Sequence, residues 1–135
     1  MAADPYADRA EAGQLLAEEL VRSIDHDHLD RPVLLALPRG GVPVAVPVAR
    51  ALAVPLSVLL VRKLGAPGQP ELAVGAVAAI GDRVQRVVNA DWVQRLGLTD
   101  QDLDRLEQSE TAVLRARVAT FGSTPAVDGR TVIIV

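Results

Sequence analysis

The chain has no cysteine, and only 2% of its 135 residues are aromatic. The lack of cysteine excludes disulfides and thiolate chemistry, which fits a reducing cytoplasm. The scarcity of aromatic side chains argues against a base-stacking surface, and a net charge of −3 offers no general attraction to nucleic acid or anionic membranes. No apolar run approaches the ~20 residues of a transmembrane helix, and residues 1–20 lack a signal-peptide pattern. We therefore expect a cytoplasmic protein that binds neither nucleic acid nor membranes.

Half of the residues are apolar, mostly Ala, Val and Leu, and the length suits a single domain over residues 1–135. Apolar patterns and turn residues alternate along the chain, which is typical of an α/β fold with a mainly parallel twisted sheet flanked by helices. The expected helices cover residues 8–24, 42–52, 92–96 and 99–120. The expected strands cover residues 32–37, 55–61, 72–80, 84–88 and 131–135.

Residues 37–43 (LPRGGVP) follow the first predicted strand and open the second helix. Two adjacent glycines allow a tight backbone turn, and Pro43 favours the start of a helix. The orphan N–H groups of a helix start, with Arg39 beside them, predict a site for a phosphate or diphosphate. A plain strand-to-helix connection is the alternative. Because an interior proline removes a helix hydrogen bond, Pro47 predicts either a kink or a later helix start.

A pair of cations, Arg62 and Lys63, stands at the end of the second predicted strand. Residues 64–71, which follow, are rich in Gly and Pro and predict a mobile loop. Two interpretations stay open for each feature. The cations either bind an anionic ligand or form a solvated strand end, and the loop is either a lid or a plain surface connection.

The other candidate motifs give weaker indications of function. The alternating Asp and His residues at 25–28 have metal-ligand character, but they lie in a polar turn where such side chains are usually solvated, and we assign no metal site. The single tryptophan, Trp92, is interpreted as a packing residue, and Glu107 is placed on a solvated helix face. No P-loop is present and no Gly-x-Gly-x-x-Gly follows a strand, which argues against a dinucleotide-binding domain.

Three segments, residues 8–13 (DRAEAG), 37–45 (LPRGGVPVA) and 61–76 (VRKLGAPGQPELAVGA), together resemble the type I phosphoribosyltransferase family. The resemblance covers essentially the whole chain in order. It implies a parallel sheet with flanking helices, Mg²⁺, and the substrate phosphoribosyl pyrophosphate (PRPP). The implied reaction transfers the phosphoribosyl group to a nitrogenous base and releases pyrophosphate. The resemblance also implies a homo-oligomer, expected to be a dimer.

The resemblance assigns roles to particular residues. The implied pyrophosphate-binding residues are Pro38, Arg39, Gly40, Gly41, Arg62 and Lys63. The implied flexible loop that closes over the reacting centre contains Gly65, Pro67, Gly68 and Glu71. No nucleophilic side chain is needed, because charge builds on the departing pyrophosphate and stabilising it is the main task.

The chain departs from the family after the strand at residues 131–135. Relatives continue with two acidic residues and a Gly/Thr-rich loop that binds the ribose and the 5′-phosphate, and this part of the fold is missing here. We expect the terminal strand to leave an open sheet edge and the 135 residues to have little or no transferase activity. The alternatives are a non-catalytic phosphate- or nucleotide-binding regulatory module and an assembly module whose sheet is completed by another chain.

Overall fold

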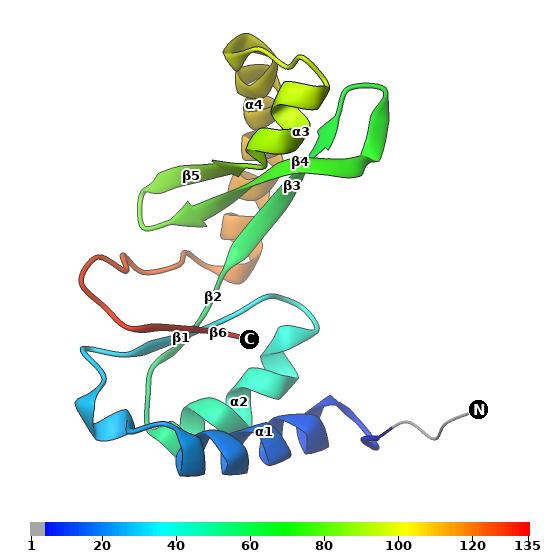
Figure 1. Cartoon of the computed structure of the whole chain (residues 1–135). Helices are drawn as coiled ribbons and strands as arrows, with labels where there is room; N and C mark the ends of the chain where they lie inside the picture. The colour runs from blue at the N-terminus through cyan, green and yellow to red at the C-terminus, as the bar shows by residue number, and fades with distance from the viewer. Residues whose placement is uncertain (1–4) are drawn as a thin grey trace. The chain divides into compact units, whose positions relative to one another are not determined.

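A parallel three-stranded sheet forms from the most apolar segments of the chain. The structure is a computed structural model that describes residues 5–135, and its strands β1 (Val33–Ala36), β2 (Leu56–Val58) and β6 (Val132–Ile134) lie in the order β2-β1-β6 (Figure 1). All four residues of β1 are buried, as expected for a central parallel strand. Among the described residues, β6 pairs with β1 alone.

Two helices pack against each other, and the second of them, α2, packs against this sheet (Figure 1). Helix α1 (Arg9–Ser23) begins at Asp8, whose carboxylate accepts a hydrogen bond from the Glu11 N–H. Helix α2 (Gly41–Leu52) runs through Pro47, so the predicted later start is wrong. The helices approach closely at Gly13, where an added Cβ would lie 2.5 Å from the Val44 carbonyl oxygen. A short 3₁₀ helix (His26–His28) follows α1.

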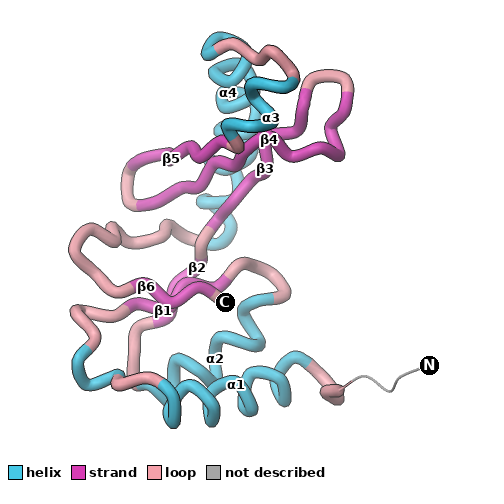
Figure 2. Tube along the Cα trace, in the orientation of Figure 1, coloured by secondary structure: helices cyan, strands magenta, loops and turns pink. Residues whose placement is uncertain are grey.

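An antiparallel sheet is the centre of a second region. Strands β3 (Leu60–Ala66), β4 (Gln69–Ile80) and β5 (Arg83–Val88) lie in the order β3-β4-β5. Helices α3 (Ala90–Arg95) and α4 (Asp100–Phe121) follow, and α4 packs on β3 and β4 (Figure 2). Helix α4 begins with a capping box, in which Thr99 and Asp102 bond reciprocally to backbone N–H groups. Its apolar stripe is buried at Leu103 and Leu114.

The prediction that residues 64–71 form a loop is wrong. Strand β3 continues to Ala66 and β4 begins at Gln69, so only Pro67 and Gly68 form the turn. Proline followed by a glycine with φ of +76° is typical of a tight type II turn. The pairing shifts on both sides of Gly65, and the displaced residues of β4 include Pro70, which has no N–H to donate. High Gly and Pro content therefore marks a bulged hairpin here.

The fold class is α/β, with a parallel sheet and packed helices, as the sequence predicts. Contacts divide the chain into a first unit, Met1–Leu59 with Val127–Val135, and a second unit, Leu60–Ala126. The parallel sheet lies in the first unit and the antiparallel sheet in the second. That residues 1–135 act as one domain stays a prediction. Within residues 5–135, no helix is both long and apolar enough to cross a membrane.

Candidate functional site

The double-glycine loop (residues 38–41) connects β1 to α2 in the first unit. The Leu37 N–H donates to the Val135 carbonyl at 2.8 Å, and the Gly41 N–H donates back to the Leu37 carbonyl at 2.8 Å. The peptide bond between Pro38 and Arg39 is cis. Within the described part of the chain, the N–H groups of Arg39 and Gly40 have no acceptor. The loop therefore offers two free backbone donors at the start of a helix, as an anion site requires.

The two glycines of this loop have different surroundings. A Cβ added at Gly41 would lie 2.6 Å from the Val135 carbonyl oxygen, so this glycine permits the close approach of α2 to the end of β6. A Cβ added at Gly40 would meet only the Arg9 side chain, 3.6 Å away. Gly40 also has helical backbone angles that any residue adopts. The fold therefore requires Gly41, whereas the bare backbone at Gly40 is left for a ligand.

Two arginines accompany the double-glycine loop. Arg39 belongs to it and is exposed. Arg9, the first residue of α1, brings its guanidinium to within 3.8 Å of the position of a Cβ at Gly40. Neither side chain forms an ion pair with any described residue. Cations without carboxylate partners beside free N–H groups favour binding of a multiply charged anion.

The other predicted cations lie in the second unit, and both have carboxylate partners. The Arg62 Nε donates to Glu110 Oε2 of α4 at 2.7 Å, and the two side chains are 33% and 25% exposed. Lys63 Nζ lies 3.7 Å from Glu71 Oε2, and both of these side chains are largely exposed. The Lys63 pair is therefore weak and solvent-screened, while the Arg62 pair is partly shielded.

A cleft of about 520 Å³ lies between the β3–β4 hairpin and α4. It gathers six residues that the sequence predicts as ligand-binding or loop residues: Arg62, Lys63, Gly65, Pro67, Gly68 and Glu71. Helix α4 contributes Leu106, Ser109 and Glu110 to the opposite wall. The structure therefore brings these six residues to one cleft, although residues 64–71 were predicted to be a loop and Arg62 and Lys63 to end a strand, whereas both lie within β3.

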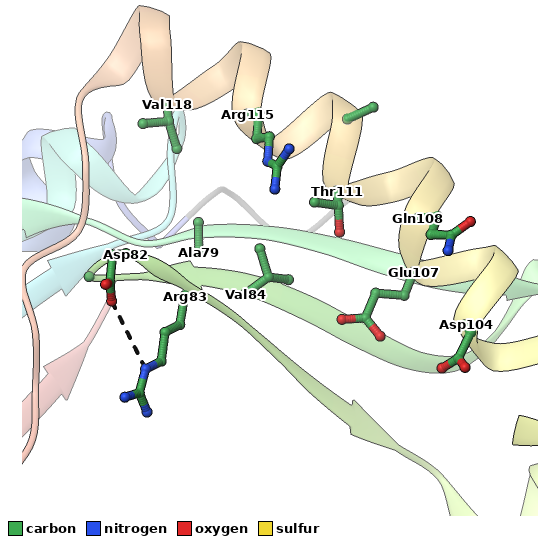
Figure 3. Close-up of a pocket in the computed structure, with 12 residues that line it drawn as sticks. Ala79, Asp82, Arg83, Val84, Asp104, Glu107, Gln108, Thr111, Arg115 and Val118 are labelled. Atoms are coloured by element: carbon green, nitrogen blue, oxygen red, sulfur yellow. Dashed lines mark ion pairs between the residues drawn. The ribbon is translucent and has the colours of Figure 1, made fainter.

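A larger cleft, of about 690 Å³, lies between the β4–β5 hairpin and α4 and contains none of the predicted residues (Figure 3). Three carboxylates line it, and two of them, Asp104 and Glu107, accept hydrogen bonds from Arg86, at 2.8 and 2.7 Å; the third is Asp82. The hydrogen bond that Arg86 donates to Asp104 is the main cause that raises the pKa of Arg86. Glu107 was predicted to be a solvated residue; the prediction is wrong because β5 places Arg86 opposite it. The cations of the smaller cleft, Arg62 and Lys63, are paired with carboxylates as well, so charge pairing does not distinguish the two clefts. The smaller cleft differs in that it contains residues predicted from the sequence to bind the ligand.

In the described part of the chain, no group of three or more His, Asp or Glu side chains is placed so that it could hold a metal ion. Of the alternating residues at 25–28, His28 Nδ1 lies 2.8 Å from Asp25 Oδ2, and both side chains are exposed. Two exposed groups on a short turn provide too few ligands for a structural metal.

Comparison with known proteins decides the family. A family model described as the phosphoribosyl transferase domain matches residues 6–135. The chain belongs to the phosphoribosyl transferase family. Two proteins of Mycobacterium tuberculosis, from strains CDC 1551 / Oshkosh and H37Rv, are named "Putative phosphoribosyl transferase". Each is 44% identical over 116 residues, which are 86% of this chain and 25% of the relative. The chain therefore spans about a quarter of the length of these curated relatives.

A solved structure has the same fold. The crystal structure of TT1426 from Thermus thermophilus superposes with a TM-score of 0.74 at 40% identity, covering 96% of this chain and 60% of that one. The family that the three sequence segments resemble is thus confirmed, and so is its fold. The roles of individual residues in this phosphoribosyl transferase domain stay predictions.

Two residues of the candidate site carry no role in the sequence-based assignment. Arg9 lies within the segment at residues 8–13. The sequence places it at the start of a helix but does not predict that its side chain lies near Gly40. Glu110 lies 48 residues from Arg62, on a helix whose charged positions read as solvated. No local pattern identifies either contact, because both depend on the packing of elements far apart in the chain.

Proposed function

We propose that this phosphoribosyl transferase domain binds PRPP, or the pyrophosphate that PRPP releases, and serves the transfer of a phosphoribosyl group to a nitrogenous base. One observation carries the proposal: in a chain that matches the family over residues 6–135, the double-glycine loop has two N–H groups and two arginines for which residues 5–135 provide no acceptor or carboxylate partner. Anionic oxygens satisfy both kinds of donor at once.

The chemistry follows from where charge develops. Breaking the bond to pyrophosphate leaves negative charge on the departing oxygens, and donors held ready by the fold stabilise it without reorganisation. In the first unit, the N–H groups of Arg39 and Gly40 and the guanidinium of Arg9 supply such donors. In the second unit, Arg62 and Lys63 supply them.

The tip of the β3–β4 hairpin (residues 65–71) is proposed to cover a ligand held by Arg62 and Lys63. Its turn residues Pro67 and Gly68 are exposed, and Glu71 pairs only loosely with Lys63. A tight turn flanked by register shifts leaves few ladder hydrogen bonds at the tip. Covering the ligand would exclude water from the leaving group.

Mg²⁺ is proposed to accompany the substrate. Because the described residues offer no group of three acidic or imidazole ligands, the diphosphate oxygens would supply ligands to the ion, as substrate phosphates often do for Mg²⁺. The base that accepts the phosphoribosyl group and the proposed homo-oligomer are further parts of the proposal.

Residues 1–135 by themselves are proposed to bind without turnover. The family resemblance implies an acidic, Gly/Thr-rich loop that binds the ribose and the 5′-phosphate, and this loop is not among residues 1–135. A regulatory module that senses PRPP or nucleotides would keep the same anion-binding loop, and this is the second candidate function. Sheet completion at β6, where Ile134 is 58% exposed, is the structural alternative.

Calorimetric titration with pyrophosphate and with PRPP, each with and without Mg²⁺, tests the proposal. We expect saturable binding that Arg39→Ala weakens. Release of pyrophosphate, followed by ³¹P NMR with a panel of bases, separates the enzyme from the sensor. An absence of binding by both ligands would contradict the proposed function.

A further inference from the structure

The pair formed by Arg62 and Glu110 is more buried than the pair formed by Lys63 and Glu71. Arg62 lies opposite Val77 in the antiparallel sheet, and Val77 is 1% exposed. Because both residues point to the sheet face that α4 covers, Arg62 is directed toward the helix instead of toward solvent. Glu110 meets it there, with 2.7 Å between Nε and Oε2.

The contact uses only one edge of the guanidinium. Arginine carries five N–H donors, of which one is on Nε and four are on the two Nη atoms. Glu110 accepts from Nε, and among residues 5–135 no acceptor is found for either Nη atom. The Nη atoms form the fork that matches two phosphate oxygens. Arg62 also lines the 520 Å³ cleft together with Lys63 and Ser109.

We propose that Glu110 is a positioning residue, which holds Arg62 through Nε so that the two Nη atoms present their donors to an anionic phosphate in this cleft. The inference rests on the proposed function, because it names what orients one of the proposed diphosphate ligands. A long arginine side chain loses rotamer freedom when it binds a ligand, and the carboxylate removes part of that freedom beforehand.

A competing account is that Glu110 merely occupies Arg62 and that the phosphate must displace it. The two accounts predict opposite orders of affinity. In Glu110→Gln, the amide oxygen still accepts from Nε but the negative charge is gone. Positioning therefore predicts that the Gln variant binds at least as tightly as the wild type, while Glu110→Ala binds about tenfold more weakly. Displacement predicts that both variants bind more tightly than the wild type.

The chain offers a matched control three residues away on the same helix. Glu107 also accepts a hydrogen bond from an arginine of the sheet, Arg86, at 2.7 Å and with similar exposure. Glu107 does not line the 520 Å³ cleft. Glu107→Ala should therefore lower the stability of the protein about as much as Glu110→Ala, without changing the affinity for pyrophosphate.

The experiment is titration of the full-length protein with pyrophosphate in the presence of Mg²⁺, combined with ¹⁵N NMR of the arginine Nε–H groups. The Arg62 signal, identified by its loss in Arg62→Ala, should be protected from solvent exchange in the wild type and in Glu110→Gln, and unprotected in Glu110→Ala. Arg62→Ala should weaken binding, and adding Glu110→Ala to it should cause no further loss.

The outcomes test the positioning role of Glu110 and the proposed function separately. Wild-type affinity in Glu110→Ala, with wild-type binding intact, overturns the positioning role and leaves the proposed function standing. Equal exchange of the Arg62 signal in the wild type and Glu110→Ala also overturns it, whatever the ligand does. Wild-type protein that does not bind pyrophosphate while the Arg62 signal is protected overturns the proposed function, and the inference with it.

Discussion

The double-glycine loop and the β3–β4 hairpin both carry predicted cations, but they present them differently. The loop offers backbone N–H groups and two arginines without carboxylate partners. The hairpin offers Arg62 and Lys63, each paired with a carboxylate. A site made from backbone depends on the exact space around each Cα, whereas a site made from side chains depends on which partners orient them. Substitutions in the double-glycine loop should therefore act by filling the space around the backbone. Substitutions in the hairpin should act by changing the charge or the orientation of its cationic side chains.

The largest expected effect tests whether shape decides the loop. Gly41→Ala should lower the free energy of unfolding by about 2 kcal/mol, because the new methyl group meets the Val135 carbonyl oxygen and backbone must shift. Urea denaturation measures the loss. Gly13→Ala, which meets the Val44 backbone away from the loop, should cause a similar loss and serves as a reference. Unchanged stability in Gly41→Ala would remove the structural role of this glycine.

The neighbouring glycine should behave in the opposite way. Gly40→Ala should leave the free energy of unfolding unchanged or raise it by about 0.5 kcal/mol, because its backbone angles suit alanine and only the Arg9 side chain is near. The methyl group would stand where the anion approaches, so pyrophosphate affinity should fall about tenfold, or ~1.4 kcal/mol. Calorimetry on the same sample measures both quantities. Unchanged affinity would show that the anion does not bind next to Gly40.

Removal of an unpaired cation should have a smaller effect. Arg9→Ala should weaken pyrophosphate binding about fivefold, or ~1 kcal/mol, because one guanidinium beside Gly40 is lost. Its stability should hardly change, since Arg9 is exposed. Arg22→Ala, on the last turn of the same helix and paired only with Glu19, is the matched control and should bind normally. Equal binding by all three proteins would exclude Arg9 from the site.

The smallest expected effect concerns pH and the helix that carries Glu110. Hydrogen bonds from the backbone N–H and then the hydroxyl of Thr99 lower the pKa of Asp102 below its ordinary value of 3.8. A carboxylate with a lowered pKa contributes stability above its unfolded-state pKa, and the contribution is lost as the pH falls through the folded-state pKa. Asp102→Asn should therefore be slightly less stable than the wild type near neutral pH and should converge with it in acid.

Urea denaturation of both proteins from about pH 6 down to about pH 2 measures this convergence. Amide exchange in the first turn of α4 locates it. A stability difference that stays constant through the acid range would show that the Asp102 charge does not contribute. Such a result would leave the hydrogen bonds of the capping box as the only contribution of this residue to α4.

Local patterns predicted much of the fold. The capping residues Asp8 and Thr99 lie where the side chain and the first free N–H groups are close in sequence, so the helix starts were predictable. The four-residue strand β1 is continuously apolar and central. The misinterpreted segment at residues 64–71 shows the limit: glycine and proline mark a departure from regular structure, and a bulged hairpin and a loop share that composition.

Much of the candidate site was also predictable, but not its organisation. The sequence pointed to the double-glycine loop and to Arg62 and Lys63, because each follows a recognisable apolar run. The predicted strand end at Arg62 and Lys63 is wrong, since both residues lie within β3. It did not separate Gly40 from Gly41, since the difference comes from Val135, 94 residues away from Gly41. It also placed Glu107 in solvent, because the partner Arg86 lies on another element.

The sequence by itself determined the family, the α/β class and the helix starts, because these depend on residues that are neighbours along the chain. Tertiary structure alone decided which glycine the fold needs, that Arg9 approaches Gly40, and that Glu110 holds one edge of Arg62. The physical reason is that close approach and ion pairing depend on distances in space. Those distances exist only once helices and strands have packed.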